Sequence, residues 1–172
     1  TINLSYGNGC VVEGAGFFLN NEMDDFSAKP GIPNAFGLIG NEANSIAPGK
    51  RPLSSMTPTI ILKDNKPFLV VGSPGGSTII TTTMQTILNV IDYEMDIKEA
   101  VCAPRFHSQW LPDVIQIEPR GLTKDVLVNL KSRGHEIIYR GGYIGESNGI
   151  MITDEGFFGG GDCRGETSAL GY

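Results

Sequence analysis

Two adjacent glycines at the start of a helix-like pattern are the first candidates for chemistry in this sequence. Gly75 and Gly76 lie in the stretch GSPGGS, where a short apolar run ends. Backbone amides at a helix start, together with the helix dipole, favour an anion. That anion is either a phosphate or the oxyanion of an acyl-transfer intermediate. A Walker loop would need a Lys after the glycines, and a dinucleotide fingerprint a different spacing, so the phosphate is the weaker choice. A tight strand-to-helix turn explains the glycines equally well.

Two further polar stretches contain carboxylates and hydroxyls. Glu22, Asp24 and Asp25 fall within four residues, in NNEMDDF, and could hold a metal, a substrate ammonium group or only water in an acidic turn. No other residue nearby completes a metal ligand set, so no metal is expected. Ser54 and Ser55 lie between prolines and can donate to a carboxylate, or simply begin a strand. Together the three stretches match the polar ends of an α-amino acid that is acylated through its side chain.

Composition excludes several classes of partner. The 172 residues include 13 basic and 19 acidic side chains, a net charge of −6 that argues against nucleic acid or an acidic membrane surface. No apolar run approaches the roughly 20 residues of a membrane span. The length suits one domain, and the initial Thr suggests a fragment or a processed subunit. Cys10, Cys102 and Cys163 are too widely spaced for a metal site or a disulfide framework, and we expect incidental thiols.

The elements that must position these residues follow from periodicity. The pattern predicts a strand over 10–19 and a long loop over 23–52, followed by strands at 57–62 and 67–71 and a helix over 77–93. Further along it predicts a short helix capped by Asp96 and Glu99, a strand at 115–118, a helix from Thr123 to Ser132, and strands at 136–139, 149–153 and 157–158. Hairpin strands with clustered helices favour an α+β layered fold with a largely antiparallel sheet.

Five stretches in collinear order resemble the small subunit of γ-glutamyltranspeptidase, a self-cleaving Ntn hydrolase. They are LNNEMDDFSAKPG, KRPLSSMTPTI, VGSPGGS, APRFHSQWLPD and the closing GY. The resemblance implies a four-layer αββα sandwich completed by a large-subunit partner. It implies transfer of the γ-glutamyl group from donors such as glutathione to water, amino acids or peptides, without a cofactor. It also implies a periplasmic or secreted enzyme.

The resemblance assigns roles to the polar residues. Asp25 is expected to hold the α-amino group of the γ-glutamyl substrate, assisted by Glu22 and Asn3. Ser54 and Ser55 are expected to bind its α-carboxylate. The role of His107 and Arg105, in APRFHSQW, is expected to be packing or subunit contact.

The remaining roles concern the reaction itself. The resemblance implies that Gly75 and Gly76 supply the oxyanion-hole amides. The family nucleophile is an N-terminal Thr, but Thr1 aligns with a later Thr whose hydroxyl supports that nucleophile. We therefore expect the nucleophile upstream of this chain and the chain alone to be inactive; Thr1 as nucleophile is the alternative. Phe36 takes the place of a Tyr that latches a lid, so we expect a looser lid and relatively more hydrolysis.

Two other functions stay open. One is a related Ntn acylase that acts on another amide, such as a cephalosporin acylase or a poly-γ-glutamate-processing enzyme. The other is a non-catalytic subunit that binds γ-glutamyl compounds or serves assembly.

Overall fold

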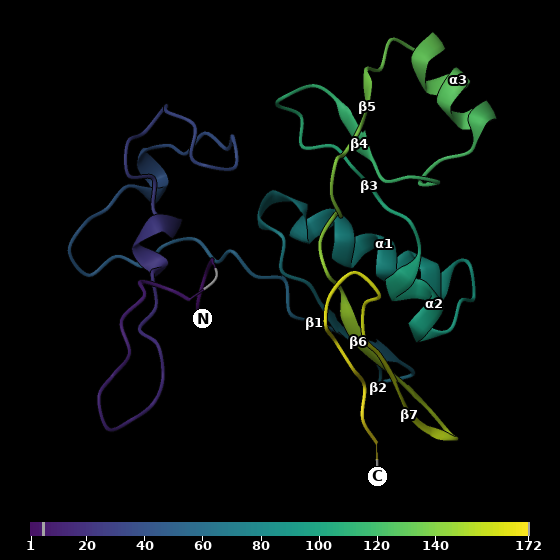
Figure 1. Ribbon diagram of the computed structural model, residues 1–172, viewed down its shortest axis with the longest axis horizontal. Coiled ribbons are helices and arrows are strands. Elements are labelled where there is room, and N and C mark those ends of the chain that lie inside the picture. Colours follow the sequence, from purple (N-terminus) through teal and green to yellow (C-terminus); the bar gives the residue numbers. More distant parts are fainter. Residues whose placement is uncertain (5, 172) are drawn as a thin grey trace. The chain divides into compact units, whose positions relative to one another are not determined.

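The structure is a computed structural model that describes residues 1–4 and 6–171 (Figure 1). Tyr172, of the closing GY, lies outside the described residues. Backbone contacts divide the chain into two compact units, Thr1–Ser55 and Met56–Tyr172, called unit 1 and unit 2. No helix of the described residues is long and apolar enough to cross a membrane.

Unit 1 consists of turns with two short 3₁₀ helices, η1 (Glu22–Asp25) and η2 (Glu42–Asn44). The long loop predicted for 23–52 is therefore confirmed, apart from these single turns. The strand predicted for residues 10–19 is wrong. The segment folds back on itself with one isolated bridge between Val11 and Phe18, because Gly14 and Gly16 adopt positive φ and reverse the chain.

A four-stranded antiparallel sheet is the main element of unit 2. Its strands are β1 (Thr59–Lys63), β2 (Lys66–Gly72), β6 (Asn148–Thr153) and β7 (Gly156–Gly160), in the order β1-β2-β6-β7. Asp64 and Asn65 form the β1–β2 turn with φ of 51° and 61°. A two-residue hairpin turn that matches the twist of its strands requires positive φ at both of these positions. All four strands were predicted to within two residues.

Two helices pack on one face of this sheet, α1 (Ile79–Ile91) and α2 (Ile97–Cys102) (Figure 1). A 3₁₀ turn, η3 (Gly76–Thr78), leads into α1. The predicted capping box of α2 is present, since Asp96 and Glu99 each accept a hydrogen bond from the other's backbone amide. The core between helices and sheet contains Leu69, Val71, Val90, Ile97, Ala100 and Val101.

A smaller three-stranded sheet lies beyond α2 in the sequence. It contains β3 (Phe106–His107), β4 (Ile115–Ile117) and β5 (Ile137–Tyr139), and helix α3 (Lys124–Ser132) connects β4 to β5. β4 and β5 run parallel, as a helical crossover allows. β3 was not predicted, because two residues carry no periodic signal.

Ile97 packs closely against Gly149 of β6, and this contact leads to a stability prediction. A Cβ at Gly149 would lie 2.7 Å from Cδ1 of Ile97, so Gly149→Ala overpacks this contact and should lower the free energy of unfolding by about 1–3 kcal/mol. Ile97→Val removes that Cδ1 and should cost about 1 kcal/mol alone. Urea unfolding of the complete protein should show that the double variant loses clearly less unfolding free energy than the sum of the losses in the two single variants. Strictly additive losses would contradict this packing.

Candidate active site

A polar cluster in unit 1 is centred on the side-chain amide of Asn3. Its Nδ2 lies 3.3 Å from Glu22 Oε2, 3.2 Å from Asp25 Oδ1 and 3.2 Å from Ser55 Oγ. The backbone amide of Asn3 donates to Asn21 Oδ1 at 2.9 Å, which fixes the N-terminal segment against the start of η1. One amide group thus connects residues from three separate segments of the chain.

Helix η1 explains why the two carboxylates meet. Glu22 and Asp25 are three residues apart in a 3₁₀ turn, where positions i and i+3 lie above one another. Ser55 Oγ donates to Asp25 Oδ2 at 3.0 Å. Asn44 donates to the carbonyl of Asp25 at 2.7 Å and accepts from Leu53 N at 2.9 Å, which ties η1 to the segment that ends at Ser55.

The electrostatics of this cluster favour a cation. Burial raises the pKa of Glu22, and hydrogen bonding to Asp25 and the negative charge of that neighbour raise it further. Among the described residues, Glu22 Oε1 is buried and has no hydrogen-bond partner. A buried acceptor left open beside a second carboxylate is complementary to an ammonium group, which would supply donors and relieve the repulsion.

Ser54 and Thr1 are close in sequence to members of the cluster. Both are exposed; Ser54 precedes Ser55, and Thr1 lies two residues before Asn3. Within the described part of the chain, no group of three or more His, Cys, Asp or Glu side chains could hold a metal ion.

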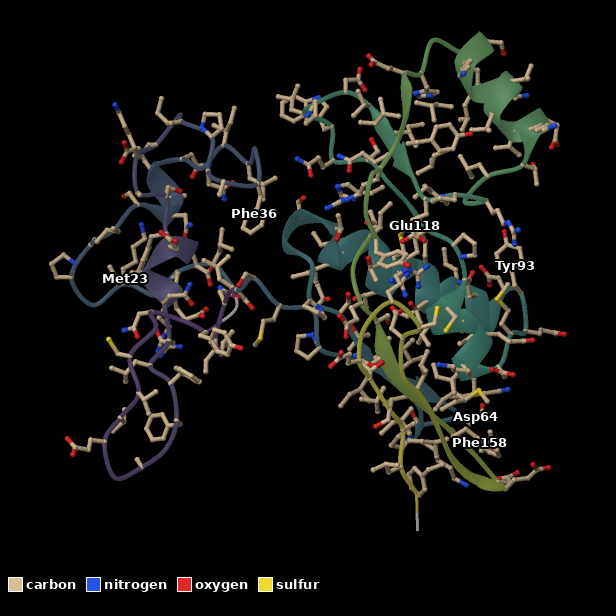
Figure 2. The ribbon with its side chains drawn as sticks, in the orientation of Figure 1. Met23, Phe36, Asp64, Tyr93, Glu118 and Phe158 are labelled. Atoms are coloured by element: carbon tan, nitrogen blue, oxygen red, sulfur yellow. The ribbon has the colours of Figure 1, made fainter. Side chains whose placement is uncertain are left out.

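Phe36 lies on a narrow loop of unit 1 (Figure 2). Asn34 organises this loop, since its Oδ1 accepts from Phe36 N at 2.9 Å and from Leu38 N at 3.0 Å. Pro33 and Ile39 form a bridge at its base. The Phe36 side chain is 49% exposed, so the loop presents an aromatic ring to its surroundings.

The glycine turn of unit 2 has a conformation that only glycine adopts easily. Gly75 has φ 139° and Gly76 has φ 57°. Thr78 donates to the carbonyl of Gly75 through both its backbone N (3.1 Å) and its Oγ1 (2.8 Å). Thr78 N is therefore the first bonded amide of the helical segment, and the amides of Gly75 and Gly76 precede it.

A second loop, residues 144–147, packs against this turn. A Cβ at Gly75 would lie 3.1 Å from Cα of Gly145, so the two backbones touch. Glu146 N donates to Ser73 Oγ at 3.2 Å. Ser147 Oγ donates to the carbonyl of Gly72 at 3.4 Å. The 144–147 loop thus packs against the glycine turn and is hydrogen-bonded to the residues that precede it.

Four buried charges hold the ends of the 144–147 loop. Arg105 pairs with Asp162 at 2.7 Å, and Arg164 pairs with Glu118 at 2.6 Å and with Asp162 at 2.9 Å. Glu118, labelled in Figure 2, accepts from Ile144 N at 2.8 Å, and Asp162 accepts from Ser147 N at 2.7 Å. We call Arg105, Glu118, Asp162 and Arg164 the buried ion network.

Pairing outweighs burial in this network. Burial alone would raise the pKa of Asp162, but hydrogen bonds and charge from Arg105 and Arg164 hold it below its usual value. Burial likewise opposes the ionisation of Glu118, whose pKa is lowered by Arg164 and by two backbone amides. Both carboxylates are therefore ionised at neutral pH.

A model of the γ-glutamyltranspeptidase family matches residues 1–172. The chain belongs to the γ-glutamyltranspeptidase family. It is 49% identical over 165 residues to the glutathione hydrolase proenzyme of Escherichia coli, covering 95% of this chain and 28% of that protein. A solved mutant of the Helicobacter pylori γ-glutamyltranspeptidase is 57% identical, with a TM-score of 0.86 over 96% of this chain and 90% of that one. The enzyme from Pseudomonas nitroreducens, solved with L-DON, is 43% identical with a TM-score of 0.86, covering 100% of this chain and 90% of that one.

These relatives confirm the predicted fold class. The γ-glutamyltranspeptidase structures are Ntn-hydrolase structures, and the chain shows the expected α+β composition with largely antiparallel sheets. Unit 2 supplies a helix layer, α1 and α2, and a sheet layer. The chain spans about 28% of the length of the E. coli relative, so it matches one part of that relative.

The γ-glutamyltranspeptidase resemblance had singled out residues that the structure brings together in unit 1. They are Asn3, Glu22, Asp25 and Ser55. It had not singled out the buried ion network, apart from a packing role for Arg105. Charged residues flanked by glycine or apolar neighbours, as in GGGDCRG, were the available signal. His107 is buried and bonded to Thr81 and Gln109, in agreement with a packing role.

Proposed function

We propose that the protein containing this chain transfers the γ-glutamyl group of glutathione and related compounds to water, amino acids or peptides. The observation that carries the proposal is the unit 1 cluster, in which Asn3 holds Glu22 and Asp25 together while Glu22 Oε1 is buried and open. Two relatives that bear the name glutathione hydrolase proenzyme support the choice of substrate.

The cluster suits both ends of the substrate's amino acid. The α-ammonium group would donate to Asp25 and to the open oxygen of Glu22. The Ser55 hydroxyl, which now donates to Asp25, has a single proton. It can therefore turn to the α-carboxylate, with Ser54 beside it, once the ammonium occupies Asp25. A single γ-glutamyl substrate would therefore supply the ammonium donors for the carboxylates and the carboxylate acceptor for the Ser55 hydroxyl.

The chemistry proposed for unit 2 is stabilisation of an oxyanion. A Thr hydroxyl attacks the γ-carbonyl while a base takes its proton, and the carbonyl oxygen becomes negative and accepts from the amides of Gly75 and Gly76. The base then gives the proton to the amine as the C–N bond breaks. Water or an amine then attacks the γ-glutamyl ester and regenerates the Thr. We propose that this Thr lies upstream of Thr1 and that Thr1 supports it, with Thr1 itself as the alternative nucleophile.

We further propose a partner and a location. Ile60, Val70 and Ile150 face each other across β1, β2 and β6 and are 37–66% exposed on the outer sheet face. An apolar row of this kind suits burial against another sheet, which we propose belongs to the large subunit of a self-cleaved precursor. The name proenzyme, which the relatives bear, supports such a precursor. We propose that chain residues 1–172 form one domain of that enzyme and that it is periplasmic or secreted.

The lid hypothesis makes a prediction about Phe36. Phe36→Tyr adds a hydroxyl to the ring on the 33–39 loop and should allow a latch that excludes water. The ratio of hydrolysis to transfer, measured on the complete protein with a γ-glutamyl anilide and glycylglycine, is expected to fall. Phe36→Leu, which adds no donor, should leave the ratio at the wild-type value or above. A ratio that stays level or rises in Phe36→Tyr would argue against a latch.

The whole proposal is tested by assaying the complete protein on γ-glutamyl anilides and on cephalosporin-type and poly-γ-glutamate amides. Turnover of the γ-glutamyl anilide is the expected result. Turnover of another amide alone would favour a related acylase, and binding of γ-glutamyl compounds without any turnover would favour a non-catalytic subunit.

A further inference from the structure

Two of the three cysteines, 61 positions apart in the sequence, lie together in unit 2. Cys102 is the last residue of α2, and Cys163 follows β7. The thiol of Cys163 donates to the carbonyl oxygen of Cys102 at 3.9 Å. Cys102 is half-buried and Cys163 is exposed, and both are free thiols. The third cysteine, Cys10, is in unit 1 and exposed.

The side chains of the two cysteines also interact with each other. Hydrogen bonding to the Cys102 side chain raises the pKa of the Cys163 thiol, and burial adds to this. Together with the 3.9 Å contact from Cys163 Sγ to the Cys102 carbonyl oxygen, this places the Cys163 thiol beside Cys102. Because the thiolate is the reactive form, the raised pKa makes the Cys163 thiol less reactive at neutral pH, and its reactivity is expected to increase as the pH rises.

The buried ion network fixes the chain on both sides of Cys163. Arg164, the next residue, donates to the carbonyls of Val101 at 3.0 Å and Ala103 at 2.7 Å. Asp162, the preceding residue, is paired with Arg105. The residues on either side of Cys102 are thus bonded to the residue that follows Cys163. The two segments that carry the thiols are held together at little further entropic cost, which gives each thiol a high effective concentration for the other.

We propose that Cys102 and Cys163 are a site of disulfide formation by exchange with a low-molecular-weight disulfide. The exposed Cys163 thiolate attacks one sulfur of the small disulfide, forms a mixed disulfide and releases one small thiol. Cys102 then attacks the Cys163 sulfur, closes the protein disulfide and releases the second small thiol. The two protein thiols lose two electrons and two protons, and the small disulfide gains both.

The bond would tie the end of α2 to the segment that carries Asp162 and Arg164. Closing a loop of 61 positions restricts the unfolded chain, so the oxidised protein should melt roughly 5 °C above the reduced one. The inference needs neither the proposed activity nor a γ-glutamyl substrate, because it rests on unit 2 contacts alone.

The test uses 2-hydroxyethyl disulfide, which has no γ-glutamyl group, on the complete protein. After treatment and alkylation, peptide mass spectrometry should show Cys102 joined to Cys163, while Cys10 remains alkylated or carries a single mercaptoethanol adduct. Cys10→Ser should form the same cross-link. Cys102→Ser should stop at a mercaptoethanol adduct on Cys163, and neither Cys102→Ser nor Cys163→Ser should show the reducible increase in Tm. Independent adducts on both cysteines, or two thiols that stay fully alkylable, would overturn the proposal.

Discussion

Asp25→Asn in the complete protein is expected to lower kcat/KM for a γ-glutamyl anilide by about 100-fold. The substitution keeps the shape of the side chain, so the bond from Asn3 Nδ2 to Oδ1 can persist. It removes the negative charge that would pair with the substrate ammonium and leaves that pairing to Glu22. Since that pair forms in both the bound substrate and the transition state, the loss should appear mainly as a higher KM.

Asp24 offers a matched control for this experiment. It is the preceding residue on the same 3₁₀ turn, but it is exposed. Asp24→Asn changes the net charge equally and should alter kcat/KM by less than about threefold, as expected for a screened surface charge. Equal losses of kcat/KM in the two variants would mean that the acidic turn acts through its overall negative potential and does not bind the substrate directly.

Asp162→Ala should lower the free energy of unfolding by about 3–5 kcal/mol. The Arg105 side chain is 1% exposed and would lose its only described carboxylate contact closer than 4 Å. Ser147 N would lose its acceptor as well, which releases one end of the 144–147 loop. Urea unfolding of the complete protein measures the loss, with exposed Asp113→Ala as the control expected to change stability by less than about 0.5 kcal/mol. A loss below about 1 kcal/mol for Asp162→Ala would contradict the stabilising role of the network.

The same network predicts a pH dependence of stability. The folded-state pKa values of Asp162 and Glu118 lie below their unfolded values, which are about 4. Their contribution is therefore complete above about pH 5 and is lost as the pH falls through the folded-state values. Unfolding free energies measured from pH 7 downward should fall steeply in the wild type below pH 5, and less steeply in Asp162→Ala. Parallel pH curves for the two proteins would show that other groups dominate acid unfolding.

Most regular elements of unit 2 could be predicted from the sequence because their patterns are local. The alternation in β1 and β2, the Asp64-Asn65 turn and the Asp96–Glu99 capping box each lie within a few neighbouring residues. The strand predicted for 10–19 is absent because Gly14 and Gly16 adopt positive φ and reverse the chain, which the apolar content of the segment does not indicate. Unit 1 contains hardly any regular structure, so its shape depends on side-chain contacts such as those of Asn3 and Asn44.

The candidate site divides in the same way. Glu22, Asp25 and Ser55 could be singled out from two short stretches, and only Asn3 came from the family resemblance alone. The contacts among them join residues up to 52 positions apart, which no spacing rule provides. The buried ion network joins α2, β4 and the segment after β7, and its members become visible only when burial and distance are known.

The most direct test of the γ-glutamyl site compares two substrates in two proteins. A γ-glutamyl anilide and the glutaryl anilide, which lacks only the α-amino group, are assayed with the complete wild-type protein and with Asp25→Asn. We predict that the wild type prefers the γ-glutamyl substrate by about 100-fold or more in kcat/KM and that the preference nearly disappears in Asp25→Asn. An equally strong preference in both proteins would show that Asp25 does not hold the amino group and would contradict the central claim.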